Sequence, residues 1–113
     1  MSLALERAAW FIKDFERQSR WDARHASETV AARYLASLKQ TLEMLTRQPG
    51  LGRARRFRHP KLHGLHSYRI EPPFNQHLIF YRHDETFLYA ERVMHAARDL
   101  PRRLAQPPDN HDE

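Results

Sequence analysis

Apolar residues recur at helical spacing between Ser27 and Gln48, and this is the strongest structural signal in the chain. The recurring positions are Val30, Tyr34, Leu35, Leu38, Leu42 and Leu45, which fall on one face of a helix. Ser27 is a suitable N-cap, Glu28 suits the helix dipole, and Pro49-Gly50 ends the pattern. An amphipathic helix of this length has to cover a second apolar surface, so the chain must fold in at least two layers.

A second, shorter helical pattern precedes it and predicts a helix over residues 6–19. Ala8, Ala9, Ile12 and Phe15 have helical spacing, with Trp10 and Phe11 alongside. Residues 20–26 are polar and lack a period, which predicts a connection, and residues 2–5 are long enough only for a very short strand. The two helices should form an antiparallel hairpin with one apolar face.

The pattern changes to strands after a basic loop that begins at residue 50. Strands are predicted over 65–71, 77–82 and 86–94, and the turns at 72–75 and 83–85 are short enough for an antiparallel meander. A short helix should follow over 97–105. The fold class is therefore α+β, with the helical hairpin on one face of a small, mainly antiparallel sheet of three or four strands. The other face should carry Arg, His and Tyr positions.

The expected core and the expected domain follow from these elements. The core should contain Phe11, Phe15, Tyr34, Leu38, Leu42, Leu45, Ile79 and Phe80, whereas Trp10 and Trp21 could anchor a partner. A chain of 113 residues suits one domain, predicted over 1–105, with an acidic, disordered tail over 106–113.

Composition narrows the class of protein. No apolar run approaches the roughly 20 residues that a membrane helix needs, and the start is charged too early for a secretory signal. The sequence has no cysteine, which excludes disulfides and fits a cytoplasmic protein. The eight histidines are scattered, so neither a metal site nor a cofactor is expected.

The net charge of +5 is unevenly distributed. No acidic residue occurs between Thr46 and Ile70, and this segment holds Arg47, Arg53, Arg55, Arg56, Arg58, Lys61 and Arg69. Arginine forms bidentate contacts with phosphate and carboxylate, so the segment indicates a nucleic acid or an acidic protein partner. The alternative is a solvated basic face without a partner.

Five segments, taken in order, resemble one protein family. They are RAAWFIKDF, LEMLTRQPGLGR, LHGLHSYRI, LIFYR and ERVMHAARDL. The chain resembles the RelE/ParE superfamily of toxins from type II toxin–antitoxin modules over about residues 3–104, in its ParE-like, plasmid stabilisation branch. The resemblance implies two helices followed by a three- or four-stranded sheet, with the N-terminal segment as an extra strand. It also implies a ParD-like antitoxin with a ribbon-helix-helix part, bound in a toxin–antitoxin hetero-oligomer.

The superfamily includes two activities, and the residue types in this sequence should discriminate between them. RelE-like members cut mRNA on the ribosome, which needs an acid, a base and cations, and Arg69, Arg82 and His95 could supply some of these groups. ParE-like members are associated with poisoning DNA gyrase. The match to the ribonuclease branch is incomplete, because Leu78 occupies the position of a basic residue and no tyrosine follows His95.

The resulting expectation is a toxin that inhibits DNA gyrase by binding, without bond-breaking of its own. The binding surface for target or antitoxin should come from Arg53, Arg55, Arg56, Arg58, Lys61, Arg69, Arg82, Arg92, His95, Arg98, Arg102 and Arg103. Structural roles compete: Arg92 could pair with Glu71 or Glu91, and Arg98-Asp99 could stabilise the short helix. The alternative functions are a ribosome-dependent mRNA endoribonuclease and a degenerate antitoxin-binding module without toxicity.

Overall fold

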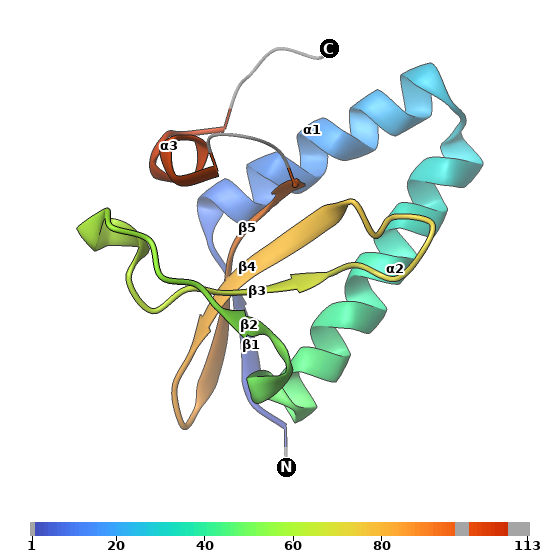
Figure 1. Cartoon of the computed structure of the whole chain (residues 1–113). Coiled ribbons are helices and arrows are strands. Elements are labelled where there is room, and N and C mark those ends of the chain that lie inside the picture. Colours follow the sequence, from blue (N-terminus) through green and yellow to red (C-terminus); the bar gives the residue numbers. More distant parts are fainter. Residues whose placement is uncertain (1, 97–99, 109–113) are drawn as a thin grey trace.

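The computed structural model describes residues 2–96 and 100–108 and contains a five-stranded mixed sheet with three α-helices (Figure 1). The strands are β1 (Ala4–Arg7), β2 (Arg53–Ala54), β3 (His66–Arg69), β4 (His77–His83) and β5 (Phe87–His95). The helices are α1 (Ala9–His25), α2 (Glu28–Arg47) and α3 (Leu100–Ala105), with 3-10 turns η1 (Pro49–Leu51) and η2 (Pro60–Leu62). The α+β class, the helical hairpin and the short C-terminal helix are confirmed.

The sheet has strand order β1-β5-β4-β3-β2, so it is larger than the predicted three or four strands. β1 runs parallel to β5, and the other neighbouring strands are antiparallel. The additional strand β2 lies in the basic loop, where two residues pair with β3. So short a strand has no readable alternation of polar and apolar residues, which is why sequence pattern missed it.

The first helix is longer than predicted, because α1 continues through the polar segment 20–25 to His25. Contacts one helical turn apart stabilise this extension. Gln18 donates to Asp22 at 3.0 Å, and the rings of Trp21 and His25 stack with centroids 4.6 Å apart. The predicted connection over residues 20–26 was therefore wrong, and the link to α2 consists of Ala26 and Ser27 only.

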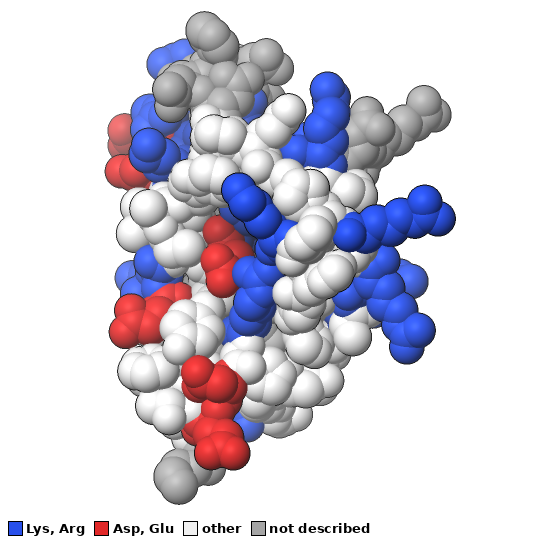
Figure 2. Space-filling model, turned by 90° about the vertical axis from the view of Figure 1, so that its left-hand side faces the viewer, with Lys and Arg blue, Asp and Glu red and all other residues white. Residues whose placement is uncertain are grey.

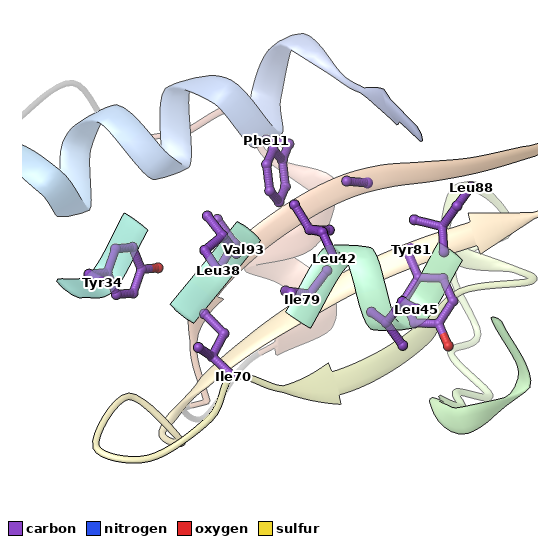
Figure 3. Close-up of a cluster of buried hydrophobic side chains, with 11 residues drawn as sticks. Phe11, Tyr34, Leu38, Leu42, Leu45, Ile70, Ile79, Tyr81, Leu88 and Val93 are labelled. Atoms are coloured by element: carbon purple, nitrogen blue, oxygen red, sulfur yellow. The ribbon is translucent and has the colours of Figure 1, made fainter. Parts of the chain in front are cut away.

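The second helix forms as its sequence pattern indicates. The Ser27 hydroxyl accepts a hydrogen bond from the Val30 amide at 3.1 Å, which confirms the N-cap. The apolar stripe of α2 packs with α1 against one face of the sheet (Figure 3). This cluster contains Phe11, Tyr34, Leu38, Leu42, Leu45 and Ile79, as expected, together with Ile70, Tyr81, Leu88, Ala90 and Val93. Phe15 is only partly buried beside it.

The opposite face of the sheet carries a second apolar cluster rather than only Arg, His and Tyr positions. It is formed by Leu62, Leu65, Leu78, Phe80, Met94 and Leu104. These residues come from η2 and the loop after it, from β4 and β5, and from α3, so the loop and the last helix cover this face. Phe80 is buried as predicted, but in this second cluster. No helix within residues 2–96 and 100–108 is long and apolar enough to cross a bilayer.

One tyrosine fixes the basic loop to the sheet. The Tyr81 hydroxyl donates to the Pro49 carbonyl at 2.7 Å and accepts from the Gly52 amide at 2.9 Å. A Cβ at Gly52 would overlap the Tyr81 ring, so only glycine lets the backbone approach this closely. The start of β2, and with it the basic segment, therefore has a fixed position beside β3 and β4.

Candidate functional site

Three arginines surround a cavity of about 480 Å³ at the β2–β3 edge of the sheet. Arg53 belongs to β2, Arg55 follows it, and Arg69 ends β3. We call this site the basic cleft and define it by these three residues. Ser67 and Glu71 also line it. Arg53 and Arg55 therefore lie close to Arg69, although they are distant from it in the sequence.

The side chains of the basic cleft have defined contacts. Arg55 Nη1 donates to the Ser67 hydroxyl at 3.3 Å, and its guanidinium lies 5.2 Å from the centre of the Phe57 ring. Arg69 Nη1 donates to the Asn75 carbonyl at 2.8 Å. Burial lowers the pKa of Arg55, and the charges of Arg53 and Arg69 lower it further. Because like charges crowd here, an anionic group such as a phosphate or carboxylate would relieve the repulsion.

Arg82 lies elsewhere and has a structural role. It forms an ion pair with Glu91 at 3.1 Å and donates to the carbonyl oxygens of Lys61 and His63. Arg82 thus joins β4 to β5 and to the loop around η2. Arg69 is paired with Leu78, four positions before Arg82 on β4, so the two arginines are separated by about 13 Å along the strand.

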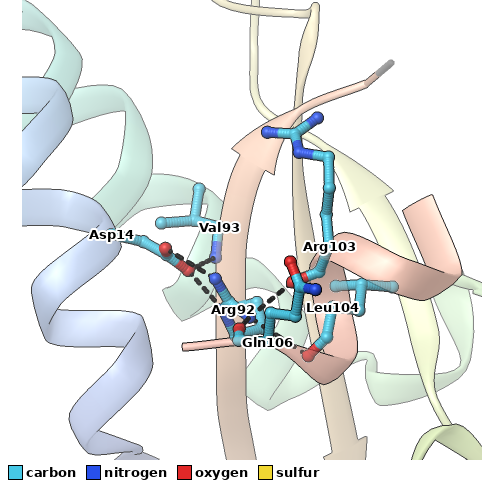
Figure 4. Close-up of polar contacts among 6 residues, drawn as sticks. All are labelled: Asp14, Arg92, Val93, Arg103, Leu104 and Gln106. Atoms are coloured by element: carbon cyan, nitrogen blue, oxygen red, sulfur yellow. Dashed lines mark hydrogen bonds and ion pairs between the residues drawn. The ribbon is translucent and has the colours of Figure 1, made fainter. Parts of the chain in front are cut away.

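Arg92 is buried and does not belong to any exposed binding surface. It is 5% exposed, and its guanidinium contacts both carboxylate oxygens of Asp14, at 2.7 and 3.0 Å (Figure 4). Its Nη1 donates to the carbonyls of Arg103, Leu104 and Gln106. The predicted pairing of Arg92 with Glu71 or Glu91 was therefore wrong. Asp14 lies 78 positions away in sequence, and local pattern gives no signal for a pair of this separation.

The Asp14 carboxylate is the shared acceptor of this cluster. Its Oδ2 also accepts from the Val93 amide at 3.1 Å, which ties α1 to β5. Burial raises the pKa of Asp14, and the hydrogen bond and charge of Arg92 oppose that rise. The Arg92 guanidinium also lies 5.3 Å from the Trp10 ring centre, while Trp10 itself remains 37% exposed. The cluster holds α1, β5 and α3 together.

His95 lies on the other side of the sheet from Arg69 and Arg82. It is paired with His77, whose Nδ1 is 3.3 Å from the Tyr34 hydroxyl of α2, so both histidines are on the helical side. Arg69 and Arg82 share the opposite face with Leu78 and Phe80 by alternation along the strands. The three candidate ribonuclease residues are therefore not brought together.

The contacts of His95 are those of an exposed residue at a strand end. Its Nε2 is 2.8 Å from Gln76 Oε1, and its ring is 5.6 Å from the ring of His77. Burial lowers the pKa of His77 to about 4, with a smaller contribution from His95. His77 is a titratable residue that sequence reasoning overlooked, because its burial depends on Tyr34 of a different element.

The remaining basic candidates are distributed over the loop and α3. Arg56, Arg58, Lys61 and Arg102 are exposed, whereas Arg103 is half-buried. Figure 2 shows the face that carries η2 and α3, where basic side chains predominate in the central and right-hand parts. Arg98 and Asp99, together with residues 109–113 of the predicted tail, lie outside the described residues. Within the described part, no group of three or more His, Cys, Asp or Glu is arranged for a metal.

Comparison with known proteins agrees with this fold. The family described as "ParE toxin of type II toxin-antitoxin system, parDE" matches residues 5–100. No protein in the curated comparison set matches the sequence. A structure titled "Chromosomal ParDE TA system from P. aeruginosa" has a TM-score of 0.68 and 11% identity, and the alignment covers 85% of this chain and 98% of that chain.

A second solved structure has the same architecture. It is titled "The crystal structure of the toxin-antitoxin complex RelBE2 (Rv2865-2866) from Mycobacterium tuberculosis", with a TM-score of 0.56 and 19% identity. The alignment covers 85% of this chain and all of that chain, 100%. These two likenesses concern the fold, and the family match over residues 5–100 goes further. The chain belongs to the ParE toxin family of type II toxin–antitoxin systems.

Proposed function

We propose that this toxin acts by binding DNA gyrase and not by cutting RNA. The observation that carries the proposal is the separation of Arg69, Arg82 and His95 in the folded chain. General acid–base catalysis requires the reacting groups within hydrogen-bond reach of one phosphate. His95 lies on the opposite side of the sheet from the two arginines, and Arg82 is engaged by Glu91. Family membership supports gyrase as the target.

We further propose that a ParD-like antitoxin with a ribbon-helix-helix part neutralises the toxin. The two similar structures are, by their titles, a ParDE system and a RelBE2 toxin–antitoxin complex. The basic cleft supports the binding of an acidic segment of the antitoxin, because its three guanidinium groups can bind carboxylates. Co-purification of the chain with the product of a neighbouring reading frame would test this pairing.

The target is tested by measuring two activities side by side. Purified toxin should inhibit the supercoiling of relaxed plasmid by gyrase or trap cleaved DNA, and should leave mRNA in a translating extract uncut. The double variant Arg53→Glu/Arg55→Glu should lose inhibition, because it reverses the charge of the basic cleft. Arg33→Glu, at an exposed position on α2, is the matched control. Unimpaired gyrase at excess toxin would contradict the proposal.

The basic cleft also supports a second candidate, a ribosome-dependent endoribonuclease, because arginines bind phosphate as well as carboxylate. Primer extension on mRNA after induction would then show codon-linked cuts. His95→Ala should abolish these cuts if His95 is the acid or base. Growth that continues normally during expression of the toxin alone would instead favour a degenerate antitoxin-binding module.

A further inference from the structure

A second cavity of about 480 Å³ lies where α1 meets the β3–β4 turn and the end of β5. We call it the α1 pocket and define it by six of its lining residues, Gln18, Trp21, Asp22, Phe74, Gln76 and Arg103. Gyrase binding, as proposed, makes no use of it, because the basic cleft is formed at the β2–β3 edge by other residues, whereas His95 of the alternative ribonuclease function also lines this pocket. Its lining combines aromatic rings, hydrogen-bonding groups and the positive charges of Arg17 and Arg103.

Asp22 is the unusual residue of the α1 pocket. It is 5% exposed, and its Oδ1 accepts from the Gln18 amide at 3.0 Å. Its Oδ2 is buried and has no hydrogen-bond partner among the described residues. Buried carboxylate oxygens are normally paired, because an unmet acceptor keeps its full desolvation cost. A ligand that brings N–H donors to this carboxylate would supply the missing partner.

The aromatic residues provide a surface for a flat ring. Trp21 is 38% exposed, and its stacking on His25 fixes the plane of its ring. Phe74 is held edge-on against Tyr34, with ring centroids 5.3 Å apart. Nucleic-acid bases stack on such side chains whatever their identity, and hydrogen bonds to the base edge then select among them.

One of the two arginines that line the pocket, Arg103, suits the other end of a nucleotide. Arg103 belongs to α3, and its Nη1 donates to the His95 carbonyl at 3.3 Å, which places the guanidinium beside the pocket. A guanidinium has five N–H donors, so one contact of this kind leaves donors for a phosphate. The volume of about 480 Å³ lies within the range of roughly 300–1,000 Å³ that is usual for small-molecule sites.

We infer that the α1 pocket binds a guanine nucleotide, either free or within a single strand. The base lies against Trp21 and Phe74, and its edge faces Asp22. Guanine presents two adjacent N–H groups on this edge, which match a carboxylate, whereas adenine presents an acceptor there and would face it unfavourably. The Gln18 side chain is half-buried and rotates away from Oδ1 when the base enters. The phosphate is bound by Arg103.

Trp21 can report on its own pocket, because the chain has two tryptophans. In a Trp10→Phe background, which keeps an aromatic ring beside Arg92, Trp21 is the sole emitter. Titration with GMP should quench it saturably, with a Kd at least about tenfold lower than that of AMP, as expected for a bidentate contact with the correct base. Ribose 5-phosphate should not quench it saturably, because it lacks the base.

Substitutions in the same background separate base recognition from adventitious binding. Asp22→Asn should abolish the preference for GMP, because the amide replaces one acceptor with a donor. Gln18→Ala should keep the preference, and the exposed Asp84→Asn is the matched control. Circular dichroism verifies that each variant folds. If Asp22→Asn does not fold, the inference requires that Gln18→Ala bind GMP more tightly than the parent protein does, because Gln18 no longer has to leave Oδ1.

Three outcomes would overturn the inference. They are equal binding of GMP and AMP, no saturable quenching by either, and an undiminished GMP preference in a folded Asp22→Asn variant. Two further ligands identify the source of the nucleotide. Tighter binding of a short guanosine-containing RNA than of GMP assigns the pocket to a strand, and tighter binding of GMP assigns it to the free nucleotide. Because the readout involves neither gyrase nor toxicity, its failure is distinct from a failure of the proposed function.

Discussion

A single guanidinium, that of Arg92, joins three elements that are far apart in the sequence. It belongs to β5 and neutralises the buried Asp14 of α1. It also satisfies carbonyl groups at the end of α3, where helical carbonyls have no partner within the helix. A buried ion pair of this kind need not stabilise a fold strongly, but the loss of one partner leaves the other charge uncompensated.

Arg92→Ala should therefore lower the free energy of unfolding by about 3–5 kcal/mol, because Asp14 would remain buried without a counter-charge. Urea denaturation followed by circular dichroism measures this loss. The exposed Arg33→Ala is the control and should change stability by less than about 0.5 kcal/mol. The double variant Arg92→Met/Asp14→Leu should recover most of the loss. Equal effects of Arg92→Ala and Arg33→Ala would refute the structural role.

His77 should make the fold sensitive to acid. Its pKa is lowered from 6.5 to about 4 in the folded state, mainly by burial and secondarily by His95. Below about pH 6.5 the unfolded chain binds a proton that the folded chain does not, so stability falls between about pH 6.5 and pH 4. Urea unfolding at several pH values should show this slope, and His77→Gln should reduce it. An identical slope in both proteins would assign the acid sensitivity to other groups.

The loop between α2 and β3 contains only two short 3-10 turns and a two-residue strand and yet has a defined position. Its order comes from Tyr81, whose hydroxyl bridges Pro49 and Gly52, and from Arg82, which binds carbonyls near η2. Sequence pattern predicted a basic loop but not these anchors, because both residues belong to β4. The basic cleft thus depends on strand residues outside the basic segment.

Gly52→Ala should destabilise the protein by about 1–3 kcal/mol, because the new methyl group would overlap the Tyr81 ring and displace the start of β2. Gly50→Ala is a close control, since nothing lies within 4 Å of a Cβ at that position. Thermal denaturation of both variants compares them directly. A neutral Gly52→Ala would show that the loop moves away without cost, and the fixed position of β2 would then be wrong.

The whole molecule shows which features a sequence can reveal. The helical hairpin and the meander were predictable because each has a repeating apolar pattern, as in α2 with its Ser27 cap. β2 and the polar end of α1, residues 20–25, were missed because neither has such a pattern. The Arg92–Asp14 pair and the burial of His77 depend on contacts between distant elements, which no local pattern contains.

The charge of the molecule should control the rate at which it meets the acidic antitoxin segment that we propose. The net charge of +5 is concentrated in the segment around the basic cleft and attracts an acidic partner. Dissolved salt screens this long-range attraction and so weakens it. The association rate, measured by stopped-flow fluorescence, should fall as ionic strength rises from about 0.05 to 0.5 M. Arg53→Glu/Arg55→Glu should flatten this dependence, whereas Arg33→Glu should largely keep it. A salt-independent rate would exclude electrostatic steering.

The parallel pairing of β1 with β5 also sets the order in which the molecule can be completed during synthesis. Ala4 is opposite Phe87 and Arg7 is opposite Ala90, so the first strand has no neighbour until the last strand exists. The Asp14 carboxylate likewise has no Arg92 to pair with until β5 has been synthesised. A nascent chain can form its helical hairpin early, but its sheet stays incomplete until β5 has left the ribosome. A toxin built in this way gains its finished surface only after β5 has been translated.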